Sequence, residues 1–158
     1  MFMDTQVLSQ LATQLQGALH TDSVMRTLYA TDASAYREMP MGVALPETIQ
    51  DIETLIQFAD KHQIPLIPRT AGTSLAGQVV GNGLVVDVSK YFDRILEVNV
   101  AESYVWVEPG VVRDVLNVEL KKHGLFIGPE TSTANRAMMG GMLGNNSCGS
   151  NSVIYGST

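Results

Sequence analysis

Cysteine is almost absent from the sequence, and its scarcity limits the chemistry that the side chains can support. Cys148 is the only cysteine among 158 residues. A single thiol cannot form an internal disulfide, and it lacks the partner ligands that a metal ion or an iron–sulfur cluster needs. We therefore predict no metal site. Because low cysteine content suits a reducing compartment, we also expect a cytoplasmic location.

Basic residues and long apolar runs are scarce as well. The 10 Lys and Arg residues face 16 Asp and Glu residues, for a formal net charge of −6. Nucleic-acid backbones demand a basic face, so we expect no nucleic-acid partner. The first twenty residues hold Asp4 and no Lys or Arg, unlike a signal peptide, and no apolar run reaches membrane-spanning length. We expect no transmembrane segment.

What the sequence does contain is apolar residues at helical spacing. Three such stripes predict three amphipathic helices: Val7, Leu8, Leu11, Leu15 and Leu19; Ile49, Ile52, Leu55, Ile56 and Ala59; and Val112, Val115, Leu116 and Leu120. A shorter helix is expected from Asp22 to Tyr29, followed by an irregular arm over residues 31–42. Thr48 and Asp51 have the spacing of a capping box, which places the start of the second long helix. We expect the second and third stripes to face the sheet.

Short extended segments lie between these helices. "VALPET" and "IPLIP" flank the second long helix, and this strand–helix–strand unit predicts two parallel neighbouring strands. Further strands are expected at residues 83–89, 94–100 and 103–109, the last two joined as a hairpin. The pattern predicts an α+β fold with a small mixed sheet flanked by helices. We place a boundary near residue 42, between an N-terminal helical arm (1–41) and the body (42–158).

The stretch "PRTAGTSLAGQ", residues 68–78, offers almost no side chain to a core. It has no lysine for a Walker A loop, and Gly72 and Gly77 do not match the dinucleotide pattern Gly-x-Gly-x-x-Gly. Small residues let successive amides converge on an anion, and a positive φ at Gly72 would help such a turn. We expect a phosphate or pyrophosphate here. The alternative is a glycine-rich turn without a ligand.

A second small-residue segment, "GPETSTANRAMMGGMLGNNSCG", covers residues 128–149. Its glycines permit close backbone approach, and its Ser, Thr and Asn side chains can hydrogen bond a heteroaromatic edge or a ribityl chain. Two such loops in one chain favour one elongated ligand. The alternative is a turn-rich tail.

The ordered series of "LPETIQDIETLIQFADKHQIPLIPRTAGTSLAGQ", "GLVVDVSKYFDRILEVN", "VWVEPGVVRDVLNVELKKHGLFIGPETST" and "MGGMLGNNSCGSNSVIYGS" resembles the FAD-binding domain of FAD-linked dehydrogenases. These are flavoproteins of the vanillyl-alcohol-oxidase type, with the PCMH-type fold, and the sequence is most similar to the D-lactate and glycolate dehydrogenase group. The resemblance covers residues 42–158. It implies a domain that is incomplete at its C-terminus, before the second subdomain is finished.

The resemblance also implies which residues bind FAD. The first loop would wrap the pyrophosphate with backbone amides, and the second segment would pass along the flavin and the rest of the cofactor. The implied cofactor-binding residues are Arg69, Thr70, Ala71, Gly72, Thr73, Ser74, Leu75, Gly77, Gln78, Pro129, Glu130, Ser132, Thr133, Ala137, Met138, Gly140, Gly141, Asn145, Asn146, Ser147 and Cys148. Relatives that tether FAD through the first loop carry histidine where this sequence has Thr73, so we expect a non-covalent cofactor.

The implied activity is oxidation of a 2-hydroxy acid of the D-lactate or glycolate type by hydride transfer to FAD. In this family a separate C-terminal domain binds the hydroxy acid and takes its proton, and an electron acceptor reoxidises the flavin. We therefore name no catalytic residue in this chain. Two alternatives are a flavoenzyme resembling UDP-N-acetylenolpyruvoylglucosamine reductase and a nucleotide-binding module without redox activity.

Overall fold

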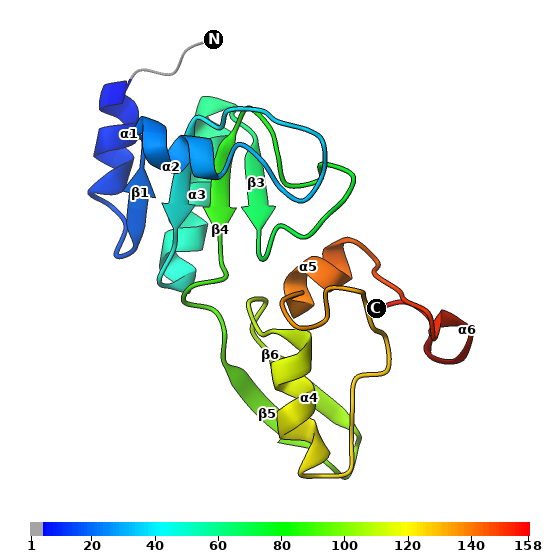
Figure 1. Cartoon of the computed structure of the whole chain (residues 1–158). Coiled ribbons are helices and arrows are strands. Elements are labelled where there is room, and N and C mark those ends of the chain that lie inside the picture. Colours follow the sequence, from blue (N-terminus) through cyan, green and yellow to red (C-terminus); the bar gives the residue numbers. More distant parts are fainter. Residues whose placement is uncertain (1–4) are drawn as a thin grey trace. The chain divides into compact units, whose positions relative to one another are not determined.

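The computed structural model describes residues 5–158, which form two compact units (Figure 1). The first unit extends to Tyr91 and the second runs from Phe92 to Thr158. None of the helices within residues 5–158 has the length and apolar character needed to cross a bilayer. In the same residues, His, Cys, Asp and Glu side chains form no group of three that could bind a metal ion.

The first unit is a four-stranded mixed sheet with helices on both faces. Its elements are α1 (Thr5–Ala12), β1 (Ala18–His20), α2 (Ser23–Leu28), β2 (Gly42–Leu45), α3 (Ile49–His62), β3 (Leu66–Arg69) and β4 (Leu84–Asp87). The strand order is β1-β2-β4-β3, with β1 antiparallel to β2 and the other pairs parallel. The central strands β2 and β4 are buried along their whole length.

Alternation along the central strands divides the core into two layers, because successive side chains of a strand point to opposite faces. On one face, Ala44 of β2 packs with Leu11 of α1 and Leu55 of α3. On the other face, Val43 and Leu45 pack with side chains that include Met25 of α2. The sheet therefore has α1 and α3 on one side and α2 on the other.

The predicted helix from Val7 to Leu19 is wrong in its second half. Helix α1 ends at Ala12, and Leu19 lies in β1, where it pairs with Ala44 of β2. Leu15 and Leu19 still pack against the core beside Leu11, so their apolar spacing reflects a shared core rather than one helix. A Cβ on Gly17 would lie 2.1 Å from the Leu45 carbonyl oxygen, so glycine allows the chain to turn back against β2.

The predicted adjacency of the two strands around α3 is also wrong. Strands β2 and β3 are both parallel to β4, but β4 lies between them. The local pattern of a strand–helix–strand unit defines strand direction, whereas a third strand from later in the chain can insert between the two. The insertion places β3 at the edge of the sheet.

Helix α3 begins at the predicted capping box, with Thr48 and Asp51 hydrogen bonded to each other's backbone amides. Its stripe is narrower than predicted, because Leu55 and Ala59 are buried but Ile49 and Ile56 are 69% and 53% exposed. Asp51 takes a buried position in place of an apolar side chain. The expectation that Ile49 and Ile56 face the sheet is therefore wrong.

The second unit packs helices against a hairpin. Its elements are β5 (Ile95–Asn99), β6 (Tyr104–Val107), α4 (Arg113–Lys121), α5 (Met139–Gly144) and α6 (Ser152–Tyr155). The predicted hairpin is confirmed, since β5 and β6 pair antiparallel with a register shift between Ile95 and Glu97. Leu116 and Leu120 are buried with Met139 and Met142 of α5. Val115 is 60% exposed, so its predicted burial is wrong.

Candidate functional site

The first small-residue loop, residues 70–82, joins edge strand β3 to β4. Gly72 has φ +64° and Gly77 has φ +75°, a region that side chains other than glycine rarely adopt. The positive φ predicted for Gly72 is confirmed. Leu75 is 80% exposed, so the loop contributes little to the core.

The loop leaves a run of backbone amides without partners. Within the described residues, the N–H groups of residues 71–75 donate no hydrogen bond, and the next amide, that of Ala76, donates to Ser74 Oγ at 3.3 Å. Buried or half-buried amides normally find acceptors. Five consecutive donors, four of them on small, half-buried residues, are therefore suited to an anionic ligand.

A neighbouring segment, residues 29–37, crosses this loop, and we call it the strap. Its Ala33 N–H donates to the Gly72 carbonyl oxygen at 3.1 Å. The Arg69 guanidinium donates from Nη1 to the carbonyl oxygens of Thr31 at 2.9 Å and Tyr29 at 3.4 Å, and its Cζ lies 5.0 Å from the centroid of the Tyr29 ring. The structure thus places the Arg69 side chain against the strap.

Gly72 and Gly77 also make room for side chains. A Cβ added to Gly72 would lie 2.6 Å from Arg69 Nη2, and one added to Gly77 would lie 2.7 Å from the Tyr36 ring. Such distances are too short for carbon atoms, so a larger residue would displace these neighbours. The glycines therefore serve the strap contact as well as the turn.

Tyr29 anchors the beginning of the strap to the sheet. Its phenol donates to Asp87 Oδ2 on β4 at 2.6 Å. Burial, together with the hydrogen bond to Asp87 and its negative charge, raises the pKa of Tyr29 well above its ordinary value. The phenol consequently stays protonated and able to donate at neutral pH.

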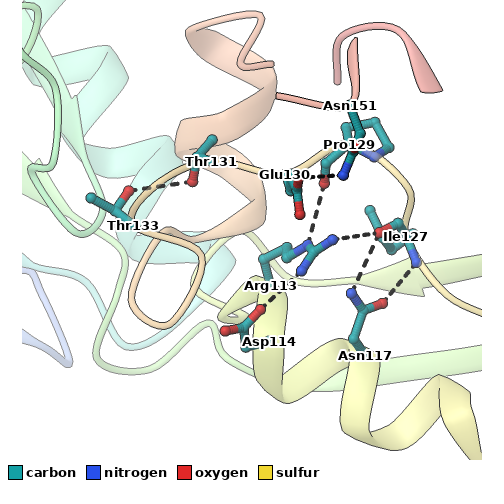
Figure 2. A network of polar contacts seen from close by, with 9 residues as sticks. All are labelled: Arg113, Asp114, Asn117, Ile127, Pro129, Glu130, Thr131, Thr133 and Asn151. Atoms are coloured by element: carbon teal, nitrogen blue, oxygen red, sulfur yellow. Dashed lines mark hydrogen bonds and ion pairs between the residues drawn. The ribbon is translucent and has the colours of Figure 1, made fainter. Parts of the chain in front are cut away.

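In the second unit, two side chains of α4 hold the predicted flavin segment. Arg113 donates from Nε to the Pro129 carbonyl oxygen at 3.2 Å and from Nη2 to that of Ile127 at 2.9 Å (Figure 2). Asn117 accepts from the Ile127 N–H through Oδ1 at 2.7 Å. These bonds fix the backbone of residues 127–129 where the chain enters the segment.

The following residues of this segment are tied to the end of the chain. Glu130 Oε1 accepts from Ser150 Oγ at 3.0 Å and from Asn151 Nδ2 at 2.6 Å, a contact visible in Figure 2. The Thr131 and Thr133 hydroxyl oxygens lie 3.3 Å apart. Ser132, between them, is exposed. One carboxylate oxygen of Glu130 thus accepts two hydrogen bonds from the protein, while Ser132 is exposed to solvent.

The segment then pairs with the chain that precedes α4. Arg113 N–H donates to the Ala137 carbonyl oxygen, and Met138 forms an antiparallel bridge with Val112. Gly140 donates to the Pro109 carbonyl oxygen, and a Cβ on Gly140 would lie 2.5 Å from Pro109 Cβ. Packing against Pro109 therefore explains glycine at position 140, whereas Gly141 is exposed.

The last predicted group, residues 145–148, follows α5 directly. Asn146 has φ +48°, and Ser147 is buried, with its Oγ accepting from Asn145 Nδ2 at 2.9 Å. The Ser147 carbonyl oxygen accepts from the N–H and hydroxyl of Thr158. The Cys148 thiol is free and exposed.

Sequence reasoning missed the residues that position the two loops. Arg113 and Asn117 act on the second segment, and Tyr29 acts on the first through Arg69. One local signal was present, because Arg113 opens a helix, where a positive charge opposes the helix dipole and needs another reason to be there. The carbonyl oxygens that accept from Arg113 lie 14 and 16 residues further along the chain, so no local sequence pattern indicates them.

Comparisons with known proteins agree on one family. D-2-hydroxyglutarate dehydrogenase of Haemophilus influenzae is 41% identical over 146 residues, which is 90% of this chain and 14% of that protein. Glycolate oxidase subunit GlcD of Bacillus subtilis is 31% identical over 84% of this chain and 29% of its own length. The chain thus spans about a seventh of the first relative and under a third of the second.

A solved structure supports the predicted PCMH-type fold. An alkyldihydroxyacetonephosphate synthase superimposes with a TM-score of 0.80 at 21% identity, over 98% of this chain and 34% of that one. The profile of the family described as FAD binding domain matches residues 40–158. The cofactor of this family is FAD, and the chain belongs to the FAD binding domain family.

Proposed function

We propose that this chain is the FAD-binding part of an enzyme that oxidises a 2-hydroxy acid. The observation that carries the proposal is the run of unpaired amides at residues 71–75, in a loop where Gly72 and Gly77 have positive φ. These donors suit a diphosphate, because backbone N–H groups can satisfy an anion without adding positive side chains to an acidic chain. The hydroxyls of Thr70, Thr73 and Ser74 add donors of the same kind.

The remaining predicted residues fit the rest of the cofactor by their chemistry. We propose that the hydroxyls of Ser132 and Thr133 and the backbone of the surrounding segment bind and orient the flavin part, with Arg113 and Asn117 fixing that backbone. Residues 145–148 complete the predicted set. When bound, FAD supplies a two-electron acceptor for the hydride that leaves the hydroxyl-bearing carbon. We assign the groups that bind the hydroxy acid and accept its proton to protein outside this chain.

The substrate class follows from the relatives, whose names include D-2-hydroxyglutarate and glycolate. We place D-2-hydroxyglutarate first, ahead of the D-lactate and glycolate expected from the sequence, because the enzyme of that name shares more residues with this chain. A separate electron acceptor would reoxidise the flavin. A cytoplasmic location remains part of the proposal, on the basis of the single cysteine.

The test is anaerobic reduction of the flavin in the full-length natural protein. We expect the visible absorbance of the oxidised flavin to bleach with D-2-hydroxyglutarate, and more slowly with D-lactate or glycolate. Bleaching by NADPH and by no hydroxy acid would instead support the reductase alternative. A purified protein without flavin that also fails to bind added FAD would contradict the proposal and favour the module without redox activity.

A further inference from the structure

The strap and Arg69 have a role that the sequence did not indicate. We infer that the strap, residues 29–37, presets the loop amides for the diphosphate, and that Arg69 is a positioning residue that acts through the strap. This inference rests on the proposed function, because it takes FAD as the ligand of the loop. It also changes the role predicted for Arg69, which was direct contact with the cofactor.

The first connection between strap and loop is the Arg69 guanidinium. Its Nη1 donates hydrogen bonds to the carbonyl oxygens of both Thr31 and Tyr29, and the guanidinium lies near the Tyr29 ring. Tyr29 is itself held on β4 by Asp87. A planar guanidinium can bridge two carbonyls and stack on a ring, whereas a lysine ammonium is a point charge on a flexible stem. Arg69 is therefore built to hold the strap in a specific place.

The second connection orients a peptide group of the loop. Ala33 N–H donates to the Gly72 carbonyl oxygen at 3.1 Å. In a planar trans peptide, the carbonyl of one residue and the N–H of the next point in opposite directions. With the Gly72 carbonyl turned toward the strap, the Thr73 N–H points away from it. The strap thus determines the direction of a donor in the middle of the unpaired run.

The strap is held in shape by contacts of its own. Thr31 and Arg37 form an antiparallel bridge, and Asp32 Oδ1 accepts from the Ser34 N–H at 2.8 Å. Tyr36 lies against Gly77 at the far end of the loop. The strap therefore contacts Arg69 before the run of unpaired amides, Gly72 within it and Gly77 after it. Such preorganisation increases affinity by reducing the ordering cost of binding.

The experiment measures FAD affinity of the full-length natural protein after the flavin has been removed. Arg69→Gln and Ala33→Pro each break one connection, and we expect each to raise the FAD Kd about tenfold or more, as the loss of one well-placed hydrogen bond would. Arg69→Lys should recover little affinity, although it keeps the charge. Arg26→Gln is the matched control, because Arg26 donates to the Pro40 carbonyl oxygen on the same arm and, within the described residues, makes no hydrogen bond to the loop.

Two further readouts separate positioning from loss of structure. The ³¹P resonances of bound FAD should shift in Arg69→Gln and Ala33→Pro, while circular dichroism and the visible flavin spectrum stay as in the wild type. Because both changes act on the strap, the double variant should lose little more affinity than the more damaging single variant.

Three results would overturn the inference while leaving FAD binding intact. The first is an unchanged Kd and ³¹P spectrum in both Arg69→Gln and Ala33→Pro. The second is a loss of FAD affinity in the Arg26→Gln control as large as in these variants. The third is additive losses of affinity in the double variant with near-complete rescue by Arg69→Lys, which would make Arg69 a direct ligand of the diphosphate. A wild-type protein that binds no FAD would instead contradict the proposed function itself.

Discussion

Asp51 joins three segments of the first unit through a single buried carboxylate. Its Oδ1 accepts from the Gln16 N–H at 2.8 Å, and its Oδ2 accepts from the amides of Gly17, Glu47 and Thr48 at 3.0, 2.8 and 3.2 Å. Only 2% of the residue is exposed. The capping residue of α3 therefore also ties the turn before β1 to the end of β2.

These contacts determine how the carboxylate titrates. Burial alone would raise the pKa of Asp51, but the four amide donors together hold it below the ordinary value of 3.8. A depressed folded-state pKa means that the ionised group stabilises the fold. The stabilisation is fully present above the unfolded pKa and is lost as the pH falls through the folded one.

We predict that Asp51→Asn lowers the local free energy of unfolding by about 3 kcal/mol at pH 7, since hydrogen bonds to a charged acceptor are lost and buried amides are left unpaired. Hydrogen exchange of peptides spanning residues 14–20 and 43–62 measures this loss, and the difference from wild type should shrink below the ordinary pKa of 3.8. Glu53→Gln, an exposed acid on the same helix, is the control. A loss that is the same at every pH would contradict the role of the ionised carboxylate.

Among the helices and strands, the sequence predicts features that adjacent residues specify and misses features that depend on residues far apart in the chain. The capping box of Thr48 and Asp51 and the β5–β6 hairpin were predicted, because a few adjacent residues specify each. The end of α1 was missed, since Leu15 and Leu19 keep a helical spacing although Gly17 turns the chain. The insertion of β4 between β2 and β3 leaves no local trace.

The candidate site follows the same division. The loop at 68–78 was predicted from its small residues to bind an anion, which stays a prediction, whereas the positive φ expected at Gly72 is confirmed. Gly140 was assigned to the cofactor, but a contact with Pro109, thirty-one positions earlier, already requires glycine there. The strap contacts of Arg69 cross a comparable gap, so only the structure could reveal them.

Gly17 offers a prediction about the pairing of β1 with β2. A Cβ there would lie 2.1 Å from the Leu45 carbonyl oxygen and 2.8 Å from the Glu47 nitrogen, both backbone atoms that cannot move without opening the sheet edge. We expect Gly17→Ala to lower the local free energy of unfolding of β1 by about 2 kcal/mol or more, as overpacking does. Hydrogen exchange of β1 and β2 amides provides the measurement.

The matched control for this change is Gly144→Ala. Nothing lies within 4 Å of a Cβ at position 144, at the end of α5. Alanine there should leave the free energy of unfolding unchanged or raise it by about 0.5 kcal/mol. If alanine at 17 were tolerated as well as alanine at 144, the close approach of the turn to β2 would not be what requires glycine.

At the scale of the whole molecule, the chain reconciles an acidic composition with an anionic cofactor. A net charge of −6 repels a diphosphate at long range, and the predicted binding loop contains one basic side chain, Arg69, which contacts the strap. We therefore propose that the attraction comes from short-range backbone dipoles, whose effect depends on geometry more than on charge. This is why the positions of the loop and strap matter more to the proposed function than the number of basic residues.

We expect the intact holoprotein to retain FAD without a covalent bond. The family resemblance implies that Thr73 stands where relatives with a covalent link carry histidine, and a threonine hydroxyl is a poor nucleophile without an adjacent base. Cys148 is the one free thiol, and it is exposed.

We expect acid precipitation of the full-length protein to release all of its flavin into the supernatant, measured by absorbance. Mass spectrometry of peptides spanning residues 69–78 and 145–150 should show no added flavin mass. Cys148→Ser should release flavin equally well and serves as the control. Flavin that stayed with the pellet would contradict non-covalent binding. Its loss from the pellet in Cys148→Ser alone would identify that thiol as the attachment point, and its persistence in that variant would require a different linked residue.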